Sequence, residues 1–338
     1  MNFFNRFSDF KSTPFSFHYK HGYYIFDMLK KNNQNVSSVL IAGGSGLIGR
    51  YLTSSLQARG YKVSHLSRKS NQFGRVRVYR WDPGNMILDP NVFNGIDCVI
   101  NLSGENLGEK RWTNKRKEAI ISSRVESTRL LYETISENKI QINTFISASA
   151  IGYYGAETTD KIYIEEDGPA SDFLGSTCKV WEEKADLFLK LGVRSVKIRT
   201  AVVLEKNDSA FSNLMKSSKF GFLVQIGGGR QFMPWIHITD LCNIYIKAIE
   251  DKSMIGPYNA ASPHHVSHKE FMKVLSGIIK RPVLFPPVPS FLVKSILGEM
   301  ADLVIKGSRI SSQKITETGY HFIFDNLDDA IKDIINNQ

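Results

Sequence analysis

Cysteine is scarce in this chain. The 338 residues contain three cysteines, Cys98, Cys178 and Cys242, and these lie far apart. An odd number at such spacing excludes a disulfide framework and a cysteine-rich zinc site, so we expect a reducing compartment, the cytoplasm. No apolar run approaches the about 20 residues that a membrane-spanning helix needs. We therefore expect no membrane partner.

Acidic residues are outnumbered, with 33 Asp and Glu against 43 Lys and Arg and a formal net charge of +10. Such an excess suits nucleic acid, but also a cofactor or substrate that carries phosphates. The basic residues are spread out apart from one cluster between Lys110 and Lys117, and no aromatic-interleaved basic stripe is present. The cluster suits recognition of an acidic substrate or a solvated helix face. We predict a small-molecule substrate and no nucleic acid, in a monomer or a homodimer.

Residues 1–35 lack any clear hydrophobic period although aromatic residues crowd them. Arg6, Asp9 and Lys11 interrupt the apolar core that a signal peptide would need. A transit peptide is one interpretation. The other, which we prefer, is that Met28 is the true start of the protein, and we expect residues 1–35 to be a loosely ordered N-terminal extension.

A glycine-rich turn organises the rest of the chain. The apolar run Val39–Ala42 predicts a buried parallel strand, and a helical run to Arg59 and a second strand, Lys62–Leu66, follow at βαβ spacing. Glycines in such a turn allow a sharp bend, let a pyrophosphate approach the backbone, and let the helix pack on the strand. The helix N-terminus offers N–H groups to phosphates. Dinucleotide binding is the prediction, an empty turn the alternative. The predicted cofactor contacts are Gly43, Gly44, Ser45, Gly46, Leu47, Ile48 and Gly49.

The end of the second strand bears on the choice of cofactor. It leads into Ser67 and Arg68, and no Asp or Glu occurs between Lys62 and Arg80. In this fold an acid there would bind the ribose 2′-hydroxyl, whereas Arg accommodates a 2′-phosphate. The sequence therefore predicts NADP rather than NAD, unless Arg68 is only part of a solvated basic loop.

Further cofactor contacts are expected at later strand ends. Small side chains after the apolar run Cys98–Asn101 suit a crevice where a ligand lies against the backbone. The predicted contacts are Leu102, Ser103, Gly104 and, in the strand Val196–Leu204, Arg199.

Strands alternate with helices along most of the chain, which predicts an α/β fold with a Rossmann-type doubly wound parallel sheet. We assign residues 36–204 and 233–262 to this nucleotide-binding domain. Residues 205–232 and 263–338 form a smaller C-terminal α/β substrate lobe over the carboxyl edge of the sheet. In that lobe we expect a capping box of Ser267 and Glu270, and a strand near Phe322.

The glycine turn, the strand ends Asn101–Gly104 and Ser147–Ser149, and the stretch Trp235–Asp240 resemble the extended short-chain dehydrogenase/reductases. More narrowly, the chain resembles the epimerase family of sugar-nucleotide-epimerase-like proteins with a distinctive C-terminal domain. The resemblance implies NADP-type binding and a substrate crevice under the C-terminal lobe. The segments that carry the narrower resemblance are Asn101–Asn106, Arg111–Thr113, Arg116-Lys117, Ser123–Val125, Ser147–Gly155, Trp181-Glu182 and Gly298–Asp302.

The chain departs from the wider superfamily where a Tyr and a Lys four residues later would carry the proton transfer. No Lys follows a Tyr by four residues in this sequence, and Leu174 and Cys178 stand at the two positions. The resemblance places Ser149 where a serine hydrogen-bonds the substrate, and Tyr153 or Tyr154 would supply the proton. The alternative for both tyrosines is packing.

Other polar residues near this region also keep two interpretations. Arg124 stands where the superfamily commonly has Asn, and it binds a substrate anion or pairs with an acid. Cys178 and His237 are more consistent with structural roles than with catalysis, and we predict no metal. The sequence thus predicts an NADP-dependent oxidoreductase or epimerase that acts on an anionic or nucleotide-linked substrate. The alternative is a non-catalytic NADP-binding sensor or interaction protein.

Overall fold

The computed structural model describes residues 38–69, 76–206 and 209–336. The chain separates into two units, Met1–Asn35 and Val36–Gln338, and every described helix and strand belongs to the second. The predicted N-terminal extension and the start near Met28 lie outside the described residues.

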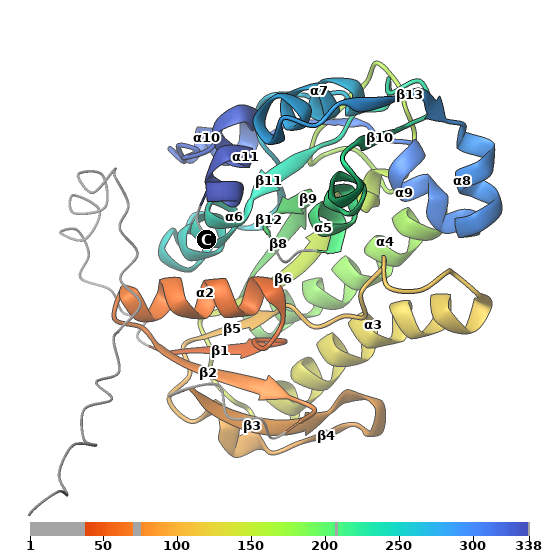
Figure 1. Ribbon diagram of the computed structural model, residues 1–338. Helices are drawn as coiled ribbons and strands as arrows, with labels where there is room; N and C mark the ends of the chain where they lie inside the picture. Colours follow the sequence, from red (N-terminus) through yellow and green to blue (C-terminus); the bar gives the residue numbers. More distant parts are fainter. Residues whose placement is uncertain (1–37, 70–75, 207–208, 337–338) are drawn as a thin grey trace, which may run out of the picture. The chain divides into compact units, whose positions relative to one another are not determined.

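An eight-stranded sheet occupies the centre of this unit, in the order β12-β8-β6-β5-β1-β2-β3-β4 (Figure 1). Every neighbouring pair is parallel except β3 and β4. The predicted doubly wound Rossmann-type sheet is confirmed. The strands are β1 (Ser38–Ala42), β2 (Lys62–Ser67), β3 (Arg77–Asp82), β4 (Ile87–Leu88), β5 (Cys98–Asn101), β6 (Thr144–Ala150), β8 (Arg194–Thr200) and β12 (Gly256–Ala260).

The strand order changes direction at β1, which lies between β2 and β5. A crevice forms at the carboxyl ends of the strands where the order of a doubly wound sheet reverses, and ligands bind there. The glycine turn follows β1 and therefore lies at this point.

Helices cover both faces of the sheet. Helices α2 (Leu47–Ala58) and α6 (Ile238–Glu250) lie on one face, and α3 (Asn114–Glu137) and α4 (Phe173–Asp186) on the other (Figure 1). Alternate residues of β1 enter the two cores: Val39 and Ile41 pack in the core with α2 and α6, and Leu40 in the core with α3. Because both faces are buried, the strand is a continuous apolar run.

The C-terminal elements have a third core of their own, which also takes in Leu204 and Trp235. This core is consistent with the predicted smaller lobe, whose boundaries stay a prediction. The elements are α5 (Ser209–Lys216), β10 (Leu223–Ile226), α7 (His268–Ile279), β13 (Val283–Val288), α8 (Ser290–Leu297), α9 (Asp302–Ile305), α10 (Gln313–Glu317) and α11 (Leu327–Asn336). Strand β10 pairs with β13; two further short pairs are β9 (Val202–Leu204) with β11 (Trp235–His237), and β7 (Ile162–Tyr163) with β14 (Arg309–Ile310).

Two local predictions in this lobe have opposite outcomes. The capping box of Ser267 and Glu270 is present at the start of α7. The prediction of a strand near Phe322 is wrong, because residues 321–326 form no strand. The N–H groups of Ile323 and Phe324 donate instead to the buried Asp240 carboxylate of α6, at 2.8 and 2.9 Å. That carboxylate takes the place of a partner strand.

The C-terminal lobe contacts the loop between β5 and α3. Lys117 pairs with Glu299, and Met300 packs against the cluster of Trp112, Ile120 and Leu174. The segment after α8 therefore lies beside the loop that leaves the carboxyl end of β5.

Candidate functional site

The glycine turn is packed so tightly that three of its positions exclude a side chain. A Cβ on Gly43, whose φ is +80°, would lie 3.0 Å from the Leu102 carbonyl. A Cβ on Gly44 would lie 2.3 Å from the His65 ring, and one on Gly49 would lie 2.6 Å from the Gly44 Cα. These contacts bring the ends of β1, β2 and β5 together under the N-terminus of α2.

Helix α2 begins without a side-chain cap. Gly46 is its N-cap residue, no side chain bonds to the first-turn N–H groups, and the first turn contains no acidic residue. Ser45 and Gly46 are exposed, and Leu47 and Ile48 are half-buried. A helix N-terminus in this state carries partial positive charge and free N–H donors, which suit a phosphate. The residues present therefore fit the pyrophosphate of a dinucleotide.

The exit of β5 holds a fixed backbone beside this turn. The Leu102 N–H donates to the Ala42 carbonyl, and the Ser103 N–H donates to Asn101 Oδ1 at 3.0 Å. The Asn101 amide is itself held by Ser127 and Thr128 of α3. The Ser103 Oγ atom is buried and has no hydrogen-bond partner among the described residues. An orphaned hydroxyl at this place is a second feature that fits a bound polar ligand.

The sequence predicted no acidic residue near Arg68 at the end of β2, but the structure places one there. Its side chain is 75% exposed, and its Nη1 atom lies 3.7 Å from Glu105 Oε1 in the loop after β5. Arg116 bonds the other Glu105 oxygen at 2.8 Å, and this bond lowers the pKa of the Glu105 carboxyl. The neighbouring Ser67 hydroxyl accepts the Lys69 N–H. The carboxylate that faces Arg68 comes from a different strand end.

The ends of β6 and β8 carry a buried ion pair. Arg199 Nε and Nη2 lie 2.8 and 2.9 Å from the two oxygens of Glu182 in α4. Both side chains are almost fully buried, with 3% and 7% of their surfaces exposed. A bidentate pair of this kind is strong only when its remaining donors and acceptors are also bonded.

The predicted catalytic hydroxyls complete this ion-pair network. The Ser149 hydroxyl donates to Glu182 Oε1 at 2.6 Å, and Arg199 Nη1 donates to the Tyr154 hydroxyl at 2.8 Å. The Tyr154 hydroxyl donates to Asn259 Oδ1 at 2.7 Å. Ser149 and Tyr154 are 3% and 2% exposed. Their hydroxyls are thus bonded inside the protein.

Tyr153 is the least buried of the three predicted catalytic residues. It is half-buried, and the Arg199 guanidinium lies 3.5 Å from the centre of its ring. Burial raises the pKa of Tyr153 and that of Tyr154 above the ordinary value of a phenol. Both side chains are therefore neutral near pH 7, and each could act only as a proton donor.

The two positions of the missing Tyr and Lys are buried. Leu174 packs against Gly152, where a Cβ would lie 3.3 Å from the Leu174 Cβ. Burial raises the pKa of the Cys178 thiol to about 12, so that it is no thiolate near pH 7. His237 caps α6 by accepting the Thr239 N–H, and its Nε2 atom lies 3.3 Å from Asp333. The burial of Cys178 and the internal contacts of His237 suit structural roles for both residues.

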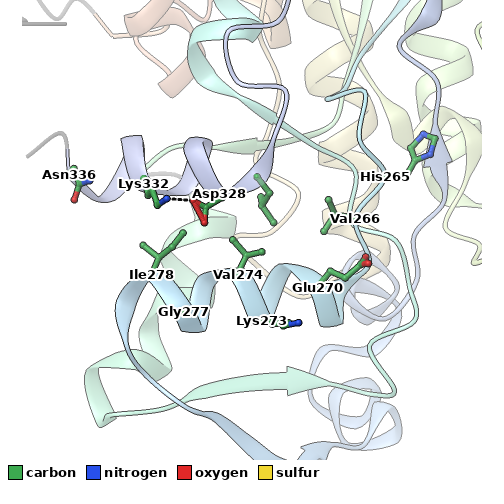
Figure 2. Close-up of a pocket in the computed structure, with 11 residues that line it drawn as sticks. His265, Val266, Glu270, Lys273, Val274, Gly277, Ile278, Asp328, Lys332 and Asn336 are labelled. Atoms are coloured by element: carbon green, nitrogen blue, oxygen red, sulfur yellow. Dashed lines mark ion pairs between the residues drawn. The ribbon is translucent and has the colours of Figure 1, made fainter. Parts of the chain in front are cut away.

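A separate groove of about 860 Å³ lies between α7 and α11 in the C-terminal lobe (Figure 2). Apolar side chains such as Val274 and Ile278 line its floor, and Asp328 pairs with Lys332 beside it. None of its lining residues belongs to the glycine turn or to the ends of β5 and β6. Among the described residues, no cluster could hold a metal ion and no helix is long and apolar enough to cross a membrane.

Comparison with known proteins identifies the family. Residues 39–175 match the NAD dependent epimerase/dehydratase family, and residues 288–334 match a domain of unknown function, DUF1731. An epimerase family protein of Mycobacterium leprae is 32% identical over 87% of this chain and 94% of its own length. One of Bacillus subtilis is 32% identical over 88% of this chain and 98% of its own length. The chain belongs to the epimerase family.

A solved structure of the same family agrees with this fold. The human epimerase family protein SDR39U1, isoform 2, was crystallised with NADPH. It has a TM-score of 0.79 and 29% identity, over 89% of this chain and all of the human chain. The predicted resemblance to this family, including its distinctive C-terminal domain, is confirmed.

Sequence reasoning missed two partners in this epimerase-family site. Glu105 was not predicted to face Arg68, and Asn259 was not predicted to bond Tyr154. A signal for Glu105 existed, since it follows β5 within the same loop as the predicted contact Gly104. No comparable signal existed for Asn259, which is 105 residues from Tyr154.

Proposed function

We propose that this chain binds NADP(H) at the glycine turn. The observation that carries the proposal is the uncapped N-terminus of α2, set against the exit of β5, with Arg68 at the end of β2. The N–H groups at the start of α2 would hold the pyrophosphate, and Arg68 would face the 2′-phosphate. Leu102, Ser103 and Gly104 would lie against the dinucleotide. The NADPH in the human relative supports this choice of cofactor.

We further propose an oxidoreductase or epimerase that acts on a small anionic or nucleotide-linked substrate. The nicotinamide, when bound, supplies hydride exchange with a substrate carbon. The chain's own part is to orient the substrate and to move a proton. Tyr153 is our leading proton donor, because it is less buried than Ser149 and Tyr154. A cytoplasmic location and a monomeric or homodimeric state stay predictions from the sequence.

A second candidate function is a non-catalytic NADP-binding sensor or interaction protein. The observation that favours it is the ion-pair network itself: the Ser149 hydroxyl is bonded to Glu182, and the Tyr154 hydroxyl to Arg199 and Asn259. A hydroxyl whose donor is already bonded inside the protein has less hydrogen-bonding capacity left for a substrate. Arg199, also predicted to contact the cofactor, donates to Glu182 and Tyr154 instead.

The first experiment is a titration of the purified protein with NADPH and with NADH, followed by nicotinamide fluorescence and thermal shift. We expect tight binding of NADPH, weak binding of NADH, and loss of this preference in Arg68→Asp. Binding of neither nucleotide would contradict the proposed cofactor site, and the proposed enzyme activity with it.

Once a carbonyl-substrate screen yields turnover, Tyr153→Phe separates the two functions. General acid catalysis typically contributes about 10²–10⁴-fold, so we expect kcat to fall by at least about 100-fold at unchanged NADPH affinity. Ser149→Ala is the matched test of the second predicted hydroxyl. Full activity in both variants would remove these residues from the catalytic assignment, and no turnover of any carbonyl substrate would favour the sensor.

A further inference from the structure

Arg124 of α3 is a half-buried guanidinium that forms no ion pair with a described residue, although the charge of nearby Glu105 acts on it. Its Nη1 and Nη2 atoms donate to the backbone carbonyls of Ile120 and Glu105, at 2.9 and 3.0 Å. No carboxylate of a described residue forms an ion pair with it. Burial lowers the pKa of Arg124, although a guanidinium remains charged near pH 7. A buried charge of this kind is costly unless something compensates it.

The two acidic side chains of the loop between β5 and α3 already pair with other basic residues. Glu105 pairs with Arg68 and Arg116, and Glu109 pairs with Arg116 and Lys110. The thiol of Cys178, whose charge would interact with Arg124, is neutral because its pKa is about 12. The positive charge of Arg124 therefore has no ion-pair partner among the described residues.

Arg124 also lies against the loop that follows β5 on one side and against α4 on the other. A Cβ on Gly104, two residues after Leu102, would lie 3.0 Å from Arg124 Cζ. On its other side the guanidinium lies 5.1 Å from the ring centre of Trp181, the residue before Glu182. Backbone carbonyls and an indole face hold the guanidinium in place without neutralising it.

We propose that Arg124 binds an anionic oxygen group of the substrate, a carboxylate or a phosphate. This proposal rests on the proposed NADP(H) site, because it places the substrate next to the loop that would contact the cofactor. A guanidinium recognises both groups through the same donor geometry. The remaining N–H donors of Arg124 have no acceptor among the described residues, so they are available to a ligand.

The test measures binding of acetate, malonate and inorganic phosphate to NADPH-saturated protein, by calorimetry and thermal shift. We expect Arg124→Gln to weaken the tightest of these anions by roughly tenfold or more, since a hydrogen bond to a charged group is lost. Arg124→Lys keeps the charge and should lie between. Arg129→Gln is the matched control, because Arg129 is on the same helix but exposed and paired with Glu126 and Glu133.

Three results would overturn the proposal. They are equal anion binding by Arg124→Gln and the wild type, an equal loss in Arg129→Gln, and no binding of any of the three anions to the wild type. Retained NADPH binding shows that Arg124→Gln is folded. If Arg124→Gln instead loses NADPH affinity tenfold, and NADPH displaces the anions from the wild type, the site binds a cofactor phosphate and the substrate assignment is wrong.

The failure of the cofactor proposal would be seen separately. If the wild type does not bind NADPH, the same anion titrations are made on the protein without nucleotide. A loss confined to the Arg124 variants would then support the anion site although the proposed function had failed.

Discussion

At the end of β1 the helix that follows has no side-chain cap and no acid in its first turn, whereas at the ends of β6 and β8 the polar side chains bond to one another. Both regions belong to the same edge of the sheet. The first leaves backbone donors for a ligand with phosphates. The second uses Ser149, Tyr154 and Arg199 to satisfy a buried ion pair. Binding of a phosphate group requires free backbone donors, and these are present at the end of β1. Proton transfer requires a hydroxyl that reaches a substrate, and the hydroxyls of Ser149 and Tyr154 are bonded inside the protein instead.

The largest effect is expected from breaking the ion pair. Arg199→Met leaves the Glu182 carboxylate buried without its cation, and such a loss typically costs about 3–5 kcal/mol. Urea unfolding should therefore show a markedly lower free energy of unfolding. Arg129→Met removes two exposed ion pairs of α3 and should change nothing measurable. Equal stability of both variants would mean that the ends of β6 and β8 do not depend on this pair.

A pH titration tests how the His65 side chain beside the glycine turn affects the stability of the protein. Burial lowers the pKa of His65, which packs against Gly44 and bonds Thr53, from 6.5 to about 4. The folded state therefore binds fewer protons than the unfolded state between these values. The stability that this provides is present above pH 6.5 and is lost as the pH falls to about 4. The shift corresponds to about 3 kcal/mol.

The measurement is urea unfolding of the wild type and of His65→Gln over this pH range. Carboxylates titrate in both proteins, so the difference between them isolates the imidazole. We expect the acid loss to be smaller in His65→Gln. If the free energies of unfolding of the two proteins fall equally with pH, protonation of His65 does not destabilise the fold.

Two glycines of the turn, Gly44 and Gly46, differ in the space that a side chain would have. A Cβ on Gly44 would lie 2.3 Å from the His65 ring, whereas one on Gly46 would lie 3.2 Å from the Gly43 carbonyl oxygen. Gly44→Ala should cost about 1–3 kcal/mol of stability and abolish NADPH binding, as overpacking does. Gly46→Ala should be milder in both thermal unfolding and NADPH titration. The reverse order would contradict the packing that we assign to the turn.

The smallest effect concerns the acid that faces Arg68. Glu105→Gln removes a negative charge from the place where the 2′-phosphate would lie. We expect NADPH affinity to rise by a few-fold at low salt, since exposed charge pairs contribute roughly 0.2–1 kcal/mol. NADH affinity should not change, and added salt should reduce the gain. Equal gains for NADPH and NADH would show that Arg68 does not contact the 2′-phosphate.

The local patterns of the sequence determined most of the fold. The apolar strands β1 and β5, the glycine turn and the capping box of Ser267 and Glu270 depend on neighbours within a few residues, and such patterns are visible in one sequence. The strand expected near Phe322 failed for the opposite reason. Its backbone donors are satisfied by the distant Asp240, which no local pattern around Phe322 reveals.

The sequence by itself determined a Rossmann-type sheet with a glycine turn after β1, and it also revealed that the Tyr and Lys pair is missing. Only the tertiary structure decided how the side chains at the strand ends are used. It brought Glu105 to Arg68, bonded Ser149 to Glu182 and Tyr154 to Asn259, and left Arg124 without an ion pair among the described residues. The physical reason is that a charged or hydroxyl group inside a protein is satisfied by whatever the fold brings within about 3 Å, regardless of separation along the chain.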